Sequence, residues 1–289
     1  MSDPVERDLI TGPRGLRIRV RHWGEQTGGR PLVILHGYLE QSAAWDRIAA
    51  ALQPWRIAVP DHRGHGLSEH VGRGGFYHFW DYVADVDALI DSLGGEVDLV
   101  GHSMGGTMAA LVAATVPAKI GSLILVEGLG PPDGAPRALE QARTALRHRR
   151  SPPRHKPVAD LDDAVTRMRR GNPDLPLDVA RELAARQTEP DPDATDGSLR
   201  WTWDALHRAR SPQAFSADAF IRTLGAIEAP TLLVEGERSP YQGIPGLNTR
   251  RQAIPGARLQ VISGCGHSPH HTHRSELIAL IREHLHARA

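Results

Sequence analysis

Cysteine is almost absent from this chain, with Cys265 alone among 289 residues. A single thiol excludes an internal disulfide framework and a thiolate metal cluster. Excess charge is absent too: 34 Lys and Arg balance 34 Asp and Glu, and 40% of the residues are hydrophobic. This composition excludes a disordered chain and argues against a nucleic-acid binder. No apolar run approaches the ~18 residues of a membrane span, and the N-terminal MSDPVERD lacks the apolar region of a signal peptide. We therefore expect a cytoplasmic protein with no membrane or nucleic-acid partner.

Short apolar runs are plentiful, and helical patterns separate most of them. The predicted strands are 5–11, 15–24, 31–36, 56–60, 97–101, 122–127, 230–235 and 258–263. The first two form a pair joined by a turn at Gly12-Pro13. The other six are rich in Val, Ile and Leu without alternation, which is typical of buried parallel strands. The predicted helices are 42–53, 76–93, 104–116, 248–254 and 271–287. This alternation predicts an α/β domain with a mostly parallel sheet.

One long segment, from about residue 130 to 225, contains no strand candidate. Residues 137–170 carry ten Lys and Arg against four Asp and Glu, a net charge of +6. Residues 174–196 carry two against seven, a net charge of −5. We interpret the segment as a solvated helical insert whose oppositely charged halves attract each other. A site for a charged ligand is the alternative.

The string VGHSMGG places a serine, Ser103, between a predicted strand and a predicted helix. This is the G-x-S-x-G pattern in the context that a nucleophile elbow requires. On such a sharp turn the hydroxyl projects beyond the sheet. The helix that begins at Met104 points its free amides and the positive end of its dipole at the same place. Ser103 is therefore the candidate nucleophile.

A nucleophilic serine needs donors for the developing oxyanion. Strand 31–36 leads into Gly37-Tyr38, so the backbone amides of Tyr38 and Met104 are the natural pair, one from each loop. We expect these two amides to form an oxyanion hole.

A serine also needs a base, and His267 follows two glycines after the last predicted strand. His270, His271 and His273 lie close behind, but no carboxylate or thiolate pattern accompanies them. We expect these three on the polar side of a helix, His267 as the base, and no metal or cofactor. Cys265 is expected to be a small buried residue near the site.

Four segments, taken together, resemble the α/β-hydrolase superfamily. They are HGY at 36–38, DHRGHGLS at 61–68, VGHSMGG at 100–106 and GCGH at 264–267. The resemblance implies an eight-stranded, mostly parallel sheet with helices on both faces. Residues 1–129 and 226–289 would form this core, and residues 130–225 would form a helical cap.

The resemblance also bears on individual residues. It implies that His62 is not catalytic and that Asp61, Gly64 and Gly66 hold a loop. The string GSLRWTWDALHR at 197–208 resembles a serine-hydrolase-like subgroup. We expect Trp201, Trp203 and His102 to line the substrate pocket. Dehalogenases and epoxide hydrolases of the superfamily carry aspartate at the elbow, and the serine argues against both.

The acid of the triad departs from the usual pattern. The family usually has its acid three residues after the glycine that follows strand 230–235, but here that position is Ser239. A minority branch places a glutamate at the end of the preceding strand, which LILVEGLGPP matches with Glu127. That strand is expected beside the nucleophile strand, so we favour Glu127. Glu235, Glu237 and Asp133 remain alternatives.

These residues predict a serine hydrolase that cleaves a small carbonyl substrate through an acyl-enzyme, and a carboxylic ester is the substrate class that we favour. Hydrolysis of a carbon–carbon bond, a lactone or an amide would use similar residues. A non-catalytic binding protein of the same fold is the alternative from another class, and Ser239 in the usual acid position is its best support.

Overall fold

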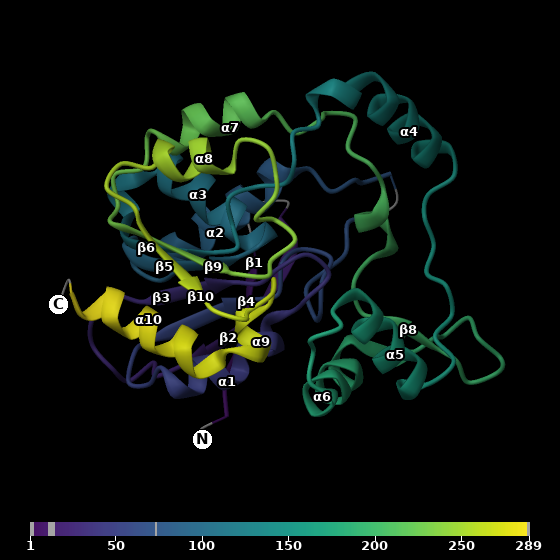
Figure 1. Cartoon of the computed structure of the whole chain (residues 1–289). Helices are drawn as coiled ribbons and strands as arrows, with labels where there is room; N and C mark the ends of the chain where they lie inside the picture. Colours follow the sequence, from purple (N-terminus) through teal and green to yellow (C-terminus); the bar gives the residue numbers. More distant parts are fainter. Residues whose placement is uncertain (1–2, 11–14, 73, 288–289) are drawn as a thin grey trace.

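A computed structural model describes residues 3–10, 15–72 and 74–287. Its main feature is an eight-stranded sheet with the order β1-β2-β4-β3-β5-β6-β9-β10 (Figure 1). The strands are β1 (Val5–Ile10), β2 (Arg17–Trp23), β3 (Leu32–Leu35), β4 (Ile57–Pro60), β5 (Val97–His102), β6 (Ile120–Val126), β9 (Thr231–Gly236) and β10 (Arg258–Ile262). Strand β2 pairs antiparallel with β1 and β4, and all other pairs are parallel. The predicted α/β fold is confirmed. The predicted turn at Gly12-Pro13 lies outside the described residues.

The central strands are buried on both faces, as their apolar sequences predict. Every residue of β3, β4, β5 and β9 is buried. Strand β10 differs, because we expected a buried strand and it is the edge of the sheet. Leu259 and Val261 of β10 are 40% and 50% exposed. An apolar run alone does not distinguish a central strand from an edge strand, because the pattern within one strand does not indicate which strands lie beside it.

Helices cover both faces of this sheet (Figure 1). One face carries α2 (Phe79–Ser92), α3 (Met104–Thr115), α7 (Ala217–Leu224) and α8 (Leu247–Ala253). The other face carries α1 (Asp46–Ala51), α9 (Pro269–Thr272) and α10 (Arg274–His286). Each layer has its own buried core, one centred on Met108 and Leu99 and the other on Trp45 and Ile34. No helix among the described residues has the length and apolarity to cross a bilayer.

The segment predicted as a cap leaves the sheet after β6. It contains α4 (Ala138–Arg150), α5 (Leu161–Gly171) and α6 (Leu177–Gln187). It also contains a small antiparallel pair, β7 (Thr188–Pro190) with β8 (Leu199–Trp201), where we expected no strand. Three-residue strands are too short to produce a periodic pattern, which is why the sequence did not reveal them. Helix α7 lies inside the predicted range 130–225, but Phe220 and Leu224 pack into the core of the sheet.

The two ends of this insert are joined where they leave the core. The amide of Gly134 donates to the carbonyl of Phe215 at 2.9 Å, and the amide of Ala217 donates to Asp133 Oδ1 at 3.0 Å. The fully buried Arg250 of α8 donates to the carbonyl groups of Leu129, Gly130 and Pro131. We call this junction the neck of the insert. It fixes both ends of the insert to the core.

The charged halves of the insert do not pair with each other as we expected. Asp178 and Glu182 of the acidic half lie 3.8 and 2.6 Å from Arg47 of the core. Asp174 likewise lies 3.3 Å from Arg238, which follows β9. No ion pair joins 137–170 to 174–196 within the described part of the chain. Arginines of the core therefore bind the acidic half of the insert, and the basic half forms no ion pair with it among the described residues.

Candidate active site

Ser103 lies on the sharp turn between β5 and α3. Its φ of 52° and ψ of −113° are strained for a residue with a side chain. The turn depends on glycine on both sides of the serine. A Cβ at Gly101 would lie 2.4 Å from the Gly105 carbonyl oxygen, and a Cβ at Gly105 would lie 2.4 Å from that of Leu35. This backbone conformation projects the Ser103 hydroxyl beyond the carboxyl edge of the sheet.

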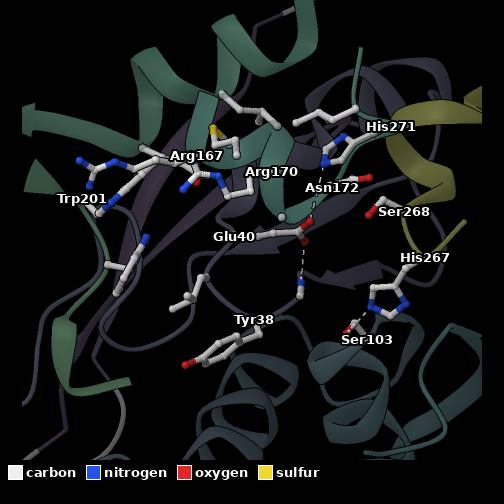
Figure 2. Close-up of a pocket in the computed structure, with 18 of the residues that line it drawn as sticks. Tyr38, Glu40, Ser103, Arg167, Arg170, Asn172, Trp201, His267, Ser268 and His271 are labelled. Atoms are coloured by element: carbon white, nitrogen blue, oxygen red, sulfur yellow. Dashed lines mark hydrogen bonds and ion pairs between the residues drawn. The ribbon is translucent and has the colours of Figure 1, made fainter. Parts of the chain in front are cut away.

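His267 connects Ser103 to Glu127. Its Nε2 lies 2.9 Å from Ser103 Oγ (Figure 2). Its Nδ1 lies 2.9 Å from Glu127 Oε2. The His267 side chain is 25% exposed, whereas the Glu127 side chain is 2% exposed. Tyr241 stacks on the imidazole, with 4.6 Å between the ring centroids. The structure thus brings the predicted nucleophile, base and acid into one hydrogen-bonded line.

The Glu127 carboxylate is anchored on the side away from the pocket. It follows β6 directly, with a φ of 54°, and its Oε1 accepts from the amide of Gly236 at 2.6 Å. Its Oε2 accepts a short hydrogen bond from the hydroxyl of Ser239. Sequence reasoning treated Ser239 as the vacated acid position and did not anticipate this contact. These donors hold the buried Glu127 carboxylate in one orientation.

The three alternative acids lie elsewhere. Glu235 is inside β9 and binds Arg251, with 2.9 Å between Oε1 and Nε. Glu237 is exposed and accepts from Ser263 and Gly264. Asp133 belongs to the neck. None of the three contacts His267 in the described structure.

The two predicted oxyanion donors are free to act. The amides of Tyr38 and Met104 donate to no acceptor within the described ranges, as a site for an incoming oxyanion requires. The Tyr38 hydroxyl reaches the insert, where it donates to the carbonyl of His207 at 2.8 Å. One residue of the oxyanion loop therefore also contacts the insert.

Glu40 is a site residue that sequence reasoning missed. Its Oε2 accepts from the Gly37 amide at 2.8 Å and lies 3.4 Å from His102 Nδ1, and its Oε1 lies 3.1 Å from His270 Nε2. His102 Nε2 in turn donates to the carbonyl of His267 at 2.9 Å. Glu40 therefore links the oxyanion loop, the elbow and the histidine loop. A single glutamate after HGY gives no sequence signal of this role.

The charges of Glu40 and His102 stabilise this link between the three loops. Burial alone would raise the pKa of the Glu40 carboxyl, but the imidazoles of His270 and His102 outweigh it and hold the pKa well below its usual range. Burial would lower the pKa of His102, but Glu40 outweighs it and raises that pKa. The two groups form an ion pair beneath the pocket. Burial lowers the pKa of His270, and the charge of Glu40 opposes that shift.

The histidines after His267 do not lie where we expected. His270 and His271 are 1% and 7% exposed, not on a polar helix face, because Trp45 stacks on His270 and Glu40 accepts from it. Ligand atoms of Glu40, His102 and His270 lie within 4.8 Å of one another, a separation that could hold a metal ion. These atoms already satisfy one another by hydrogen bonds and the ion pair.

Two further predictions concern residues near the site. Cys265 is completely buried, and burial raises the pKa of its thiol.

Asp61 accepts from the amides of Ser42 and Leu67, and a Cβ at Gly66 would lie 2.3 Å from Asp61 Oδ2. Asp61 and Gly66 thus shape the loop after β4.

A cavity of about 910 Å³ lies between the site and the insert. Ser103, His267 and Tyr38 line it from the core side. The predicted pocket residues His102, Trp201 and Trp203 also line it. The rings of Trp201 and Trp203 are stacked, with 6.1 Å between centroids. This volume is large enough for a substrate of many heavy atoms.

A serine at a strand–helix elbow, hydrogen-bonded to a histidine at the carboxyl edge of a mostly parallel sheet, defines the class of α/β hydrolases. The family model described as "alpha/beta hydrolase fold" matches residues 30–274. The chain belongs to this family.

Several similar proteins carry hydrolase names. The chain is 28% identical over 230 residues to the "Serine hydrolase-like protein" of Danio rerio, covering 73% of this chain and 68% of that protein. It is 33% identical over 245 residues to the "3-hydroxybutyrate-oligomer hydrolase" of Cupriavidus necator, covering 78% and 79%. Among solved structures, the "Thioesterase Domain From Curacin Biosynthetic Pathway" has a TM-score of 0.83 at 32% identity, covering 97% of this chain and 99% of that one.

Proposed function

We propose that this protein is a serine hydrolase that cleaves a carboxylic ester by a Ser103–His267–Glu127 triad. The observation that carries the proposal is the position of His267, with one ring nitrogen 2.9 Å from Ser103 Oγ and the other 2.9 Å from Glu127 Oε2. A serine hydroxyl is a poor nucleophile until such a base removes its proton.

The reaction proceeds in two halves. Ser103 Oγ attacks the carbonyl carbon while His267 Nε2 takes the hydroxyl proton, and the amides of Tyr38 and Met104 receive the oxyanion. The intermediate collapses to an acyl-enzyme as His267 delivers the proton to the leaving alcohol. Water then attacks the acyl group, with His267 as base, and releases the acid and free Ser103. Glu127 orients the imidazole and stabilises its cationic form.

A thioester is the second candidate substrate class. The same acyl-enzyme chemistry serves both classes, and the solved structure at 32% identity is called a thioesterase domain. The relative from Cupriavidus necator is named for the hydrolysis of a hydroxybutyrate oligomer, which favours an oxygen ester. Carbon–carbon bond and lactone hydrolysis remain alternatives.

Labelling with a fluorophosphonate probe and hydrolysis of p-nitrophenyl butyrate test the proposal. We expect the wild type to be labelled and active, and Ser103→Ala to be unlabelled and to lose nearly all turnover. Such variants of triad enzymes retain only ~10³–10⁴-fold catalysis over water. Near-normal turnover by Ser103→Ala would refute the nucleophile. A wild type that is neither labelled nor active would favour the non-catalytic binding protein.

A further inference from the structure

The charges that line the insert side of the cavity are unbalanced. Four basic residues line it, namely Lys156, Arg167, Arg170 and Arg208. The acidic lining residue of the insert is Asp163, and Arg167 already pairs with it at 2.6 Å. The other three form no ion pair among the described residues, and the charge of Asp163, which Arg170 also senses, does not balance them.

We name Lys156, Arg170 and Arg208 the basic rim. Their side chains form no hydrogen bond or ion pair with the residues that the structure describes. All three are exposed and can reach a ligand. Figure 2 shows Arg170 on the insert, across the cavity from Tyr38 and Glu40 of the core. Arg208 lies close enough to Tyr38 to act on the pKa of its hydroxyl electrostatically.

The core side of the cavity does not neutralise the basic rim. Its acid, Glu40, already interacts with the imidazoles of His102 and His270 and the amide of Gly37. The acidic half of the insert contributes only uncharged residues to the lining, namely Leu175, Leu183 and Gln187. Its carboxylates face core arginines instead, as Asp178 and Glu182 do with Arg47.

From this charge separation we infer that the cavity takes an ester or thioester that carries an anionic group, which the basic rim binds. This inference rests on the proposed function. Arginine and lysine bind carboxylate, phosphate or sulfate oxygens by charge-assisted hydrogen bonds. A positively charged mouth also raises the rate at which anionic substrates arrive.

The anion could lie on the acyl part or on the leaving group, and two matched substrate pairs distinguish these sources. The first pair is the p-nitrophenyl monoester of glutaric acid and the neutral p-nitrophenyl valerate. The second is butyryl-coenzyme A and the neutral butyryl-N-acetylcysteamine. At low ionic strength we expect kcat/KM to be about tenfold higher for the anionic member of at least one pair. This is the ratio that the free energy of one charge-assisted hydrogen bond produces.

Arg170→Gln and Lys156→Gln should each reduce that preference several-fold and leave the neutral member within about twofold, because an exposed ion pair is worth up to ~1 kcal/mol. Arg181→Gln is the matched control, since Arg181 is an exposed arginine of α6 that does not line the cavity. Salt should also reduce the preference, because the Debye length falls from about 10 Å at 0.1 M to about 3 Å at 1 M.

Equal kcat/KM within both pairs would overturn the inference while leaving the hydrolase intact, provided that the neutral substrates are cleaved. A preference that Arg181→Gln reduces as much as Arg170→Gln would also overturn it, because the effect would then follow net charge and not the basic rim. Loss of turnover with all four substrates would refute the proposed function itself.

Discussion

The hydroxyl of Ser239 donates to the carboxylate of Glu127, across the gap between the β9 loop and the end of β6. Ser239 occupies the position after β9 where the family usually has its acid. Here Ser239 supplies a hydrogen-bond donor, and the carboxylate comes from Glu127 after the neighbouring strand β6. In the proposed triad, the acid and the position that usually carries it are thus different residues that remain in contact.

The first prediction concerns the acid itself. Glu127→Gln should lower kcat by about 10²–10⁴, because the imidazole loses the charge that orients it. Glu235→Gln is the matched control, since Glu235 is a buried glutamate on the adjacent strand that binds Arg251. It should cost far less activity. Steady-state kinetics with p-nitrophenyl butyrate measure both, and the reverse order would move the acid to β9.

The second prediction concerns Ser239. Ser239→Ala should lower kcat several-fold, because Glu127 loses one donor while the Gly236 amide still holds its carboxylate. In the Glu127→Ser background, Ser239→Asp should restore part of the lost activity by returning a carboxylate to the usual acid position. No gain over Glu127→Ser alone would show that this position cannot orient His267.

The third prediction concerns Glu40 as a positioning residue. Glu40→Gln should lower kcat more than it raises KM, because the Gly37 loop and His102 lose a common partner. The same residue should affect stability, because the pKa of its carboxyl is lower in the folded than in the unfolded chain. Glu40 therefore stabilises the fold at a pH above the unfolded pKa, and this contribution is lost as the pH falls through the folded pKa. The variant should thus be less stable at pH 7 and approach the wild type in strong acid. Glu237→Gln, at an exposed carboxylate, is the control.

The fourth prediction concerns the insert tryptophans. Trp201→Ala and Trp203→Ala should change the relative rates across p-nitrophenyl esters of different acyl length, because both residues line the cavity. The rate of fluorophosphonate labelling should change less, because neither residue contacts Ser103 in the described structure. An unchanged ester profile in both variants would contradict a role for the insert in substrate choice.

The fifth prediction concerns pH. Burial lowers the pKa of His207 to about 4, because this residue of the insert packs against the rings of Tyr77 and His65. The unfolded chain binds the proton more tightly between pH 6.5 and 4, so stability falls as pH drops through this window. A shift of this size corresponds to a loss on the order of 2 kcal/mol at pH 5. Urea unfolding at pH 8 and pH 5 measures it, and the difference should shrink in His207→Gln.

The sheet and the proximity of the proposed triad residues were predictable because each carries a local pattern. Buried parallel strands form apolar runs in the sequence. The elbow requires glycines near Ser103, because a Cβ at Gly101 or Gly105 would collide with neighbouring backbone. Glu127 could be selected because a residue at the carboxyl end of a strand next to β5 lies close to the elbow in any such sheet.

Contacts between distant segments were not predictable. Glu40 and His270 are 230 residues apart, and nothing near either one indicates the other. The edge position of β10 depends on which strands are its neighbours, and the pairing of the acidic half of the insert with Arg47 depends on how the insert packs. Such features are set by tertiary packing, which local composition does not encode.

The neck gives the insert the properties of an exchangeable part. Its two ends already lie within hydrogen-bond distance at Gly134 and Phe215, so a tight turn could bridge them at little cost in chain entropy. The reacting residues, both oxyanion amides and Glu40 all lie outside the insert. Exchange of the segment between Asp133 and Ala217 should therefore change specificity and keep the proposed triad, at the cost of the contact between Tyr38 and His207.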